Sequence, residues 1–85
     1  MDKKTVSPLA QAMGRELTRW RKQRAMTRDT VAEKAGVSPT TLGRWERGDT
    51  MPDFDQAWDL ADALGVPLSE IVRHLEDVRL WVVDE

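Results

Sequence analysis

The sequence predicts an all-α protein, a compact bundle of five helices. Three observations support this fold class. Apolar residues recur every three or four positions through most of the chain, the spacing of helices with one buried side. Glycine, proline and capping residues divide the chain at short intervals, and no stretch of useful length alternates as a strand does. With 85 residues, the chain is expected to form a single domain.

The first helix is expected from about residue 8 to residue 24. Ser7 supplies a capping hydroxyl, and Pro8 suits the first helical position. Gly14 inside the helix costs about 1 kcal/mol relative to alanine, which weakens the first turns. The side expected to face the core contains Leu9, Met13, Leu17 and Trp20.

Two short helices are expected next, each ended by a glycine. Thr27 can cap the second helix, which ends at Gly36, where the chain enters positive φ. Ser38 and the proline after it start the third helix, which ends at Gly48. The second helix has a small apolar side made of Val31, Ala32 and Ala35.

Asp53 and Gln56 resemble the capping box of a fourth helix, which ends at Gly65. Leu60 is expected on the flank of an apolar stripe that contains Phe54, Ala57, Trp58, Ala61 and Leu64. A fifth helix is expected from near Leu68, with Ile71, Val72, Leu75, Val78 and Val82 at helical spacing. Residues 79–85 fit either a continued helix or a short strand. The expected division is an arm at 1–7, a helical domain at 8–79 and a tail at 80–85.

The composition argues against an enzyme and against a metal or cofactor site. There is no cysteine, so a disulfide framework and a thiolate zinc site are excluded. The single histidine, His74, leaves no set of groups for nucleophilic catalysis. No run approaches the roughly 18 apolar residues of a membrane span. No apolar segment follows the basic N-terminus, as a secretory signal would require. A cytoplasmic protein is expected.

Charge is divided unevenly along the chain. Residues 1–52 contain 11 Lys/Arg and 6 Asp/Glu, a balance of +5. Residues 53–85 contain 2 Lys/Arg and 9 Asp/Glu, a balance of −7, so that the whole chain is at −2. The basic half can meet a polyanion while the acidic half faces away from it. An unevenly charged, solvated surface would give the same counts.

The tight turn between the second and third helices predicts helix-turn-helix geometry. Ala32 is small enough for the two helices to cross closely, and Gly36 turns the chain. The inside of the angle is expected to be filled by Val37, Leu42 and Trp45. The outer side of the third helix then contains Pro39, Thr40, Gly43, Arg44 and Arg47.

This outer side has the chemistry of a DNA-reading surface. Arg44 can make a bidentate pair with guanine, and Thr40 can reach a base through its hydroxyl or its methyl group. The other expected base contacts are Thr41 and, through apolar contact only, Pro39. Phosphate contacts are expected from the N-terminal amides of the second helix and from Thr27, Arg28, Ser38 and Arg47.

These residues resemble the Cro and phage-repressor helix-turn-helix family, also called the XRE family. The resemblance covers about residues 17–71 and rests on LTRWR (17–21), TRDTVAEKAGVS (27–38), TLGRWERG (41–48), Pro52 and LADALGV (60–66). It implies a five-helix, lambda-repressor-like domain with its third helix in the major groove. It also implies an ion pair between Arg21 of the first helix and Glu46 of the third.

Three positions depart from the family pattern. Arg28 replaces a frequent glutamine at the start of the second helix, which keeps donors for a phosphate but loses the acceptor. Pro39 replaces a frequent base-reading glutamine, so that readout shifts to Thr40, Thr41 and Arg44. Pro67 replaces the usual capping Ser or Thr of the fifth helix.

The sequence therefore predicts a sequence-specific regulator that binds double-stranded DNA, a repressor of bacterial or phage origin. One small domain contacts few phosphates, so a homodimer on two half-sites is expected. Its interface is expected within residues 72–85, at Leu75, Val78, Trp81 and Val82. Trp81 fits packing on its own domain equally well. The alternative is a protein-interaction module, such as an antitoxin or adaptor, that binds a protein partner through the acidic second half and the apolar tail.

Overall fold

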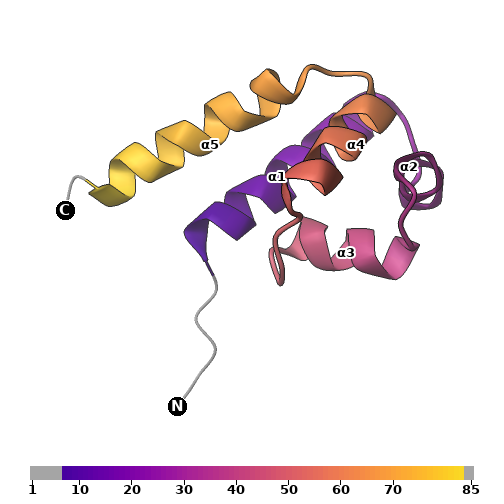
Figure 1. Ribbon diagram of the computed structural model, residues 1–85, viewed down its shortest axis with the longest axis horizontal. Helices are drawn as coiled ribbons and strands as arrows, with labels where there is room; N and C mark the ends of the chain where they lie inside the picture. The colour runs from indigo at the N-terminus through magenta and orange to yellow at the C-terminus, as the bar shows by residue number, and fades with distance from the viewer. Residues whose placement is uncertain (1–6, 84–85) are drawn as a thin grey trace, which may run out of the picture.

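The computed structural model describes residues 7–83, with side chains described as far as Glu76. The described residues form five helices and no strand (Figure 1). They are α1 (Pro8–Gln23), α2 (Arg28–Ala35), α3 (Pro39–Arg47), α4 (Phe54–Leu64) and α5 (Leu68–Val83). The predicted all-α fold is confirmed. None of these helices has the length and apolar character needed to cross a membrane.

Local capping sets the helix ends at the predicted residues. The Ser7, Thr27 and Ser38 hydroxyls accept hydrogen bonds from amides in the first turns of α1, α2 and α3. Asp53 and Gln56 form both halves of the predicted capping box. The helices α2, α3 and α4 end at glycines in the left-handed region, with φ between 73° and 80°.

Alanine, not glycine, takes the left-handed position at the end of α1. Ala25 has φ 55° and is the one non-glycine residue with positive φ among residues 7–83. Next to it, the Arg24 side chain reaches the end of α4, where Nε donates to the Leu64 carbonyl at 2.9 Å and Nη2 to the Gly65 carbonyl at 3.1 Å. The guanidinium thus occupies the negative end of the α4 dipole and ties α1 to α4.

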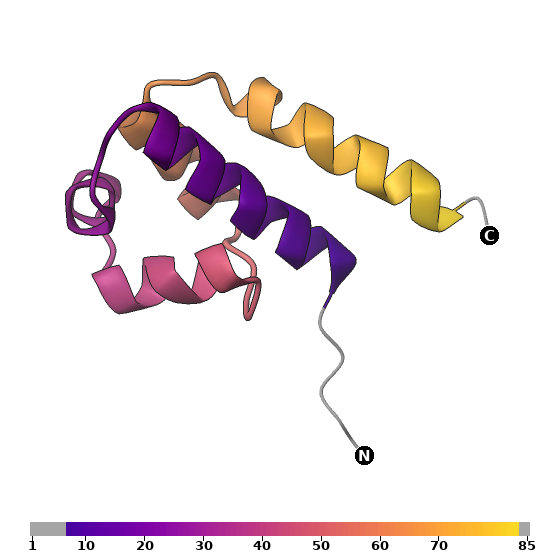
Figure 2. The ribbon, with the colours of Figure 1, turned by 180° about the vertical axis from the view of Figure 1, so that it is seen from behind.

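The five helices pack around one another as a bundle. The long helices α1 and α5 lie side by side, α3 crosses the other side of α1, and α2 packs against α3 and α4 (Figures 1 and 2). The core contains one buried cluster, whose largest fully buried side chains are Leu17, Val31, Leu42, Leu60 and Ile71.

The buried side of α4 differs from the prediction. Phe54 is 72% exposed and Trp58 is 61% exposed, although both were expected in the core. The buried residues are Ala57, Leu60, Ala61 and Leu64, of which Leu60 was expected only on the flank. The side of α4 that contains these four residues faces the other helices of the bundle, which leaves the two aromatic side chains on its outward side. Trp45 is buried as predicted. Trp20 is half-buried, with the guanidiniums of Arg19 and Arg24 4.9 and 5.4 Å from the centre of its ring.

The start and the end of α5 can be compared with the expectations for Pro67 and for residues 79–85. Pro67 provides no capping hydroxyl, and the Glu70 amide instead donates to the Pro67 carbonyl at 3.0 Å. The helix continues through Val83, so that residues 80–83 are helical and not a strand; residues 84–85 lie outside the described residues. Leu75 was predicted as a dimer contact, but it is buried in the core of its own domain, where α5 packs on α1.

Candidate nucleic-acid interface

The recognition-type helix α3 has one buried and one exposed side, as its sequence predicts. Leu42 and Trp45 are buried against the core. On the opposite side Thr40, Arg44 and Arg47 are exposed. Ala32 is fully buried beneath the crossing, and Gly36 turns the chain between α2 and α3 with φ 78°. The short helix is therefore anchored from inside, with its basic side left free for a ligand.

An open hollow of about 310 Å³ lies where α2 begins beside the outer side of α3. Gly43 is part of its lining. A Cβ at residue 43 would lie 3.3 Å from an Arg47 nitrogen and 3.9 Å from Arg28 Cδ. The side chains of Arg28 and Arg47 thus lie on either side of Gly43, which is itself buried. The remaining residues that line the hollow are Asp29, Pro39 and Thr40. The guanidiniums of Arg28 and Arg47 and the Thr40 hydroxyl can donate to anionic or acceptor groups that approach the hollow.

The positive charges on this side differ in their partners. Arg47 Nε donates to Asp49 Oδ2 at 3.1 Å, and both side chains are largely exposed. Arg44 is exposed and takes part in none of the ion pairs formed between residues 7 and 76. A ligand that binds Arg44 therefore displaces no carboxylate of residues 7–76, whereas one that binds Arg47 competes with Asp49.

Glu46 holds three helices together beneath this surface. Its side chain is 4% exposed, and its carboxylate accepts from Arg21 Nε at 2.7 Å and from Arg21 Nη2 at 3.2 Å. This is the pair that the family resemblance implies. Arg28 Nε also donates to Glu46 Oε1, at 3.0 Å. The second contact was not predicted, because it depends on how α2 sits against α3. It orients Arg28, whose side chain is still 48% exposed.

Three of the predicted DNA-contacting hydroxyls also have structural roles. Thr27 Oγ1 accepts from the Thr30 amide at 3.1 Å. Ser38 Oγ accepts from the Thr41 amide at 3.1 Å and donates to Thr41 Oγ1 at 3.0 Å. Thr41 is half-buried and shares the side of the helix that contains Trp45, so it lies off the outer side. The structure thus brings Thr40, Arg44, Arg47, Arg28 and Pro39 together and leaves Thr41 at the margin.

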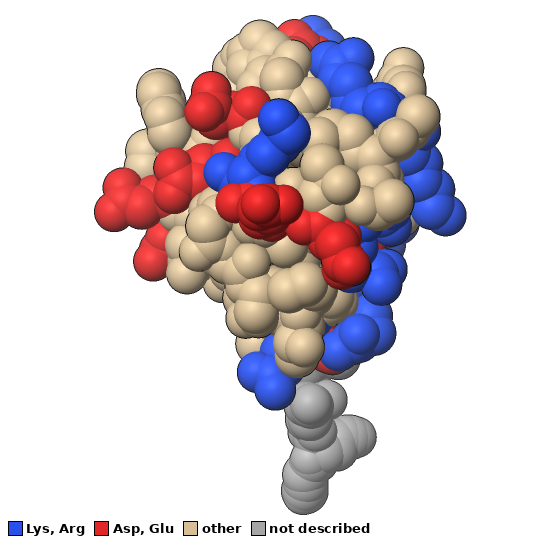
Figure 3. Space-filling model, turned by 90° about the vertical axis from the view of Figure 1, so that its right-hand side faces the viewer, with Lys and Arg blue, Asp and Glu red and all other residues tan. Residues whose placement is uncertain are grey.

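The charge separation predicted from the sequence is visible on the surface. On the face shown in Figure 3, Lys and Arg run along the right-hand side and the lower edge, whereas Asp and Glu gather on the left and across the middle, with basic atoms among them. The single histidine lies away from the α3 surface, on α5, with Nδ1 3.1 Å from Glu16 Oε1 on α1. Of the predicted dimer contacts, the side chains of Val78, Trp81 and Val82 lie outside the described residues.

Comparison with known proteins agrees with this arrangement. A family model described as helix-turn-helix (HTH_3) matches residues 17–71. The HTH-type transcriptional regulator SutR of Escherichia coli (strain K12) is 34% identical over 76 residues, which cover 89% of this chain and 43% of SutR. The uncharacterized HTH-type transcriptional regulator YazB of Bacillus subtilis (strain 168) is 32% identical over 62 residues, covering 73% of this chain and 90% of YazB.

A solved structure gives the same result for the fold. The clp gene regulator ClgR from Corynebacterium glutamicum superposes with a TM-score of 0.76 at 26% identity, covering 81% of this chain and 90% of that one. The chain therefore spans less than half of SutR but most of YazB and of the ClgR structure.

Proposed function

The chain belongs to the XRE-type helix-turn-helix family, and on that basis we propose that it is a sequence-specific regulator of transcription that binds double-stranded DNA. The observation that carries the proposal is the outer side of α3, where Thr40 and Arg44 are exposed on a helix anchored from behind by Leu42 and Trp45. The major groove of B-DNA admits one helix of this width.

Base readout is assigned to Arg44 and Thr40. Arg44 is free of carboxylate partners within residues 7–76, so its five donors are available for the two acceptors of guanine. Thr40 lies one turn before it and can contact a base through its hydroxyl or methyl group. Gly43 has no side chain, which leaves room for the Arg28 and Arg47 side chains beside the helix. Pro39 contributes apolar contact only.

Phosphate binding is assigned to Arg28, Arg47 and the first turn of α2. Glu46 holds Arg28 at the rim of the hollow, which reduces the side-chain entropy that a phosphate contact would cost. Thr27 and Ser38 contribute mainly by capping α2 and α3, which aims the free N-terminal amides outward. The acidic side of the molecule then faces away from the duplex.

Two further parts of the proposal concern activity and assembly. We propose repression, since a domain seated in the major groove blocks other proteins from the same site. We also propose a cytoplasmic homodimer on two half-sites, because a single small domain buries limited DNA surface. The relatives SutR and YazB are named as regulators in bacteria, which supports a bacterial or phage origin.

Binding to duplexes at two salt concentrations tests the DNA proposal. A selection from random duplexes should enrich one site, and the affinity for it should fall steeply as salt rises, because phosphate contacts release counterions. The double variant Arg28→Ala/Arg47→Ala should flatten the salt dependence, whereas Glu33→Ala, an exposed change on α2, should not. Absence of duplex binding at low salt would overturn the proposal.

Sedimentation of the full chain tests the dimer. With Leu75 buried, the contact is assigned to the later part of α5. Removal of residues 80–85 should shift the mass from dimer to monomer, with Asp84→Asn/Glu85→Gln as a control that keeps the length. A dimeric mass after the truncation would locate the interface elsewhere.

A further inference from the structure

Two aromatic side chains are exposed on α4, away from the DNA-reading side of α3. Phe54 and Trp58 are one helical turn apart and 72% and 61% exposed, and nearby Met51 is 39% exposed. They are the three exposed large apolar residues among those whose side chains are described. Scattered apolar residues on a surface are ordinary, but a contiguous group of this kind on a small domain marks an interaction surface.

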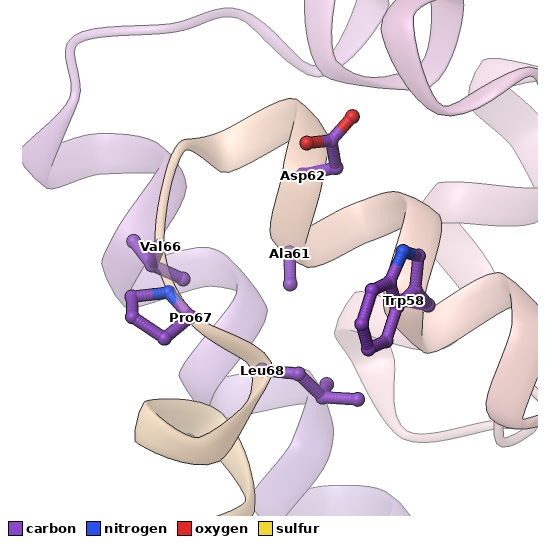
Figure 4. A pocket seen from close by; sticks show the side chains of 6 residues that line it. All are labelled: Trp58, Ala61, Asp62, Val66, Pro67 and Leu68. Atoms are coloured by element: carbon purple, nitrogen blue, oxygen red, sulfur yellow. The ribbon is translucent and has the colours of Figure 1, made fainter.

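Shallow hollows on both sides make this surface continuous. One, of about 280 Å³, is lined by Met13, Met51, Pro52, Phe54, Ala57, Leu68, Val72 and Leu75, with the Asp53 side chain at its edge. The other, of about 160 Å³, lies between Trp58 and the start of α5. Leu68 lines both hollows and extends toward the Trp58 indole (Figure 4). We call this continuous surface, from Met51 through Phe54 and Trp58 to Val66, the α4 face.

The segment that forms most of the α4 face is acidic, and basic groups lie only at its edge: the Arg24 guanidinium at the carbonyls of Leu64 and Gly65, and Arg73, which pairs with Glu70. Residues 48–72 contain no Lys or Arg and six acidic residues: Asp49, Asp53, Asp55, Asp59, Asp62 and Glu70. Asp55, Asp59 and Asp62 are exposed on α4 itself, and Asp62 borders the hollow beside Trp58. A second copy that met this face symmetrically would bring these carboxylates against their own equivalents, which is unfavourable.

We propose that the α4 face docks a basic amphipathic helix of another protein. Apolar side chains one turn apart on that helix would enter the hollows beside Phe54 and Trp58, and its Lys or Arg residues would pair with Asp55, Asp59 and Asp62. The residues of this face come from α4, the loops on either side of it, the start of α5 and Met13 of α1, whereas the DNA-reading surface comes from α2 and α3, so both ligands can bind at once. The proposal does not depend on DNA binding.

A peptide selection on the purified full chain provides the test. The probe is a random library of about 12 residues, roughly three helical turns. The enriched peptides are expected to have a net positive charge and apolar residues three or four positions apart. Their affinity, measured by fluorescence anisotropy, should fall at least about tenfold in Phe54→Ala/Trp58→Ala, as expected for aromatic anchors. Both side chains are exposed, so circular dichroism should report unchanged folding of this variant.

A matched pair of charge reversals tests the electrostatic part. Asp55→Lys/Asp59→Lys should lower the affinity for the selected peptides. Glu33→Lys/Asp29→Lys, two exposed changes on α2, should leave that affinity unchanged. Acidic or neutral consensus peptides, or peptides that bind Phe54→Ala/Trp58→Ala normally, would overturn the proposal. So would a lower sedimentation mass of Phe54→Ala/Trp58→Ala, because the α4 face would then be covered by a second copy of the chain.

Discussion

Gly14 of α1 lies directly against the backbone of Glu46 at the end of α3. A Cβ at residue 14 would press on the Glu46 carbonyl oxygen and lie 2.6 Å from the Trp45 carbonyl oxygen. Neither group is a flexible side-chain end, so the two helices would have to separate. The glycine that weakens α1 as a helix is therefore the residue that lets α1 and α3 pack at this distance.

Two glycine-to-alanine changes should have opposite effects for this reason. Gly14→Ala is expected to lower the free energy of unfolding by about 1–3 kcal/mol or more, as overpacking does. Gly43→Ala, also inside a helix, would press only on the flexible end of the Arg47 side chain and make an ordinary contact with Arg28 Cδ, so it should be neutral or stabilising by up to about 1 kcal/mol. Urea unfolding followed by tryptophan fluorescence measures both. Equal effects of the two changes would mean that the close approach of α1 and α3 at Gly14 does not exclude a Cβ at this position.

Ala25 is a position where a glycine should stabilise the protein. Its φ of 55° is left-handed, and the Met26 amide next to it closes the end of α1 by donating to the Arg21 carbonyl at 3.1 Å. Ala25→Gly removes the steric cost of the Cβ and should raise the free energy of unfolding by roughly 0.5–1 kcal/mol. The control is Ala63→Gly within α4, which should lower it by a similar amount. The same sign for both changes would contradict the prediction.

Local features of the sequence were sufficient to predict the helix boundaries. The capping residues and the terminal glycines act within a few residues of the ends they define, and each of them does so in the structure. The buried side of α3 was also predictable, because Leu42 and Trp45 are its only large apolar residues. The outer residues of α3 follow from them by helical periodicity alone.

Features that depend on contacts between helices were not predictable. The aromatic side chains of α4 point outward because the helix buries Ala57, Leu60, Ala61 and Leu64 against its neighbours, and the spacing of apolar residues on α4 fits either orientation. The close approach at Gly14 and the contact of Arg28 with Glu46 likewise depend on how three helices cross. Hydrophobic spacing within one helix contains no information about such crossings.

Glu46 should contribute far more to the stability of the fold than its exposed partner Arg28. Its carboxylate is 4% exposed and paired with Arg21, which is 12% exposed. Glu46→Ala leaves that mostly buried guanidinium without a carboxylate partner, and should lower the free energy of unfolding by about 3 kcal/mol or more. Arg28→Ala removes only the exposed partner, so its effect should stay below about 1 kcal/mol. Equal losses in urea unfolding would mean that Arg28, not Arg21, is the principal partner of Glu46.

Arg44 and Arg47 should affect DNA binding in different ways. Arg44 is unpaired within residues 7–76 and lies on the outer side of α3, so Arg44→Ala should relax specificity at one base pair and cost about 1–3 kcal/mol on the preferred site. Arg47→Ala should weaken binding to all duplexes alike. It should also reduce by about 1 the slope of the logarithm of the binding constant against the logarithm of the salt concentration. Competition binding to a selected site and to its single-base variants measures both effects.

Asp49 provides the matched control for this comparison. Its carboxylate pairs with Arg47 at 3.1 Å, so Asp49→Asn releases the guanidinium and removes a negative charge close to the DNA-reading side. Nonspecific affinity should then rise, with base preference unchanged, because a phosphate no longer competes with a carboxylate for Arg47. An unchanged base preference in Arg44→Ala, together with altered preference in Arg47→Ala, would reverse the two roles. The recognition helix would then lie in the groove with its C-terminal end, not its middle, against the bases.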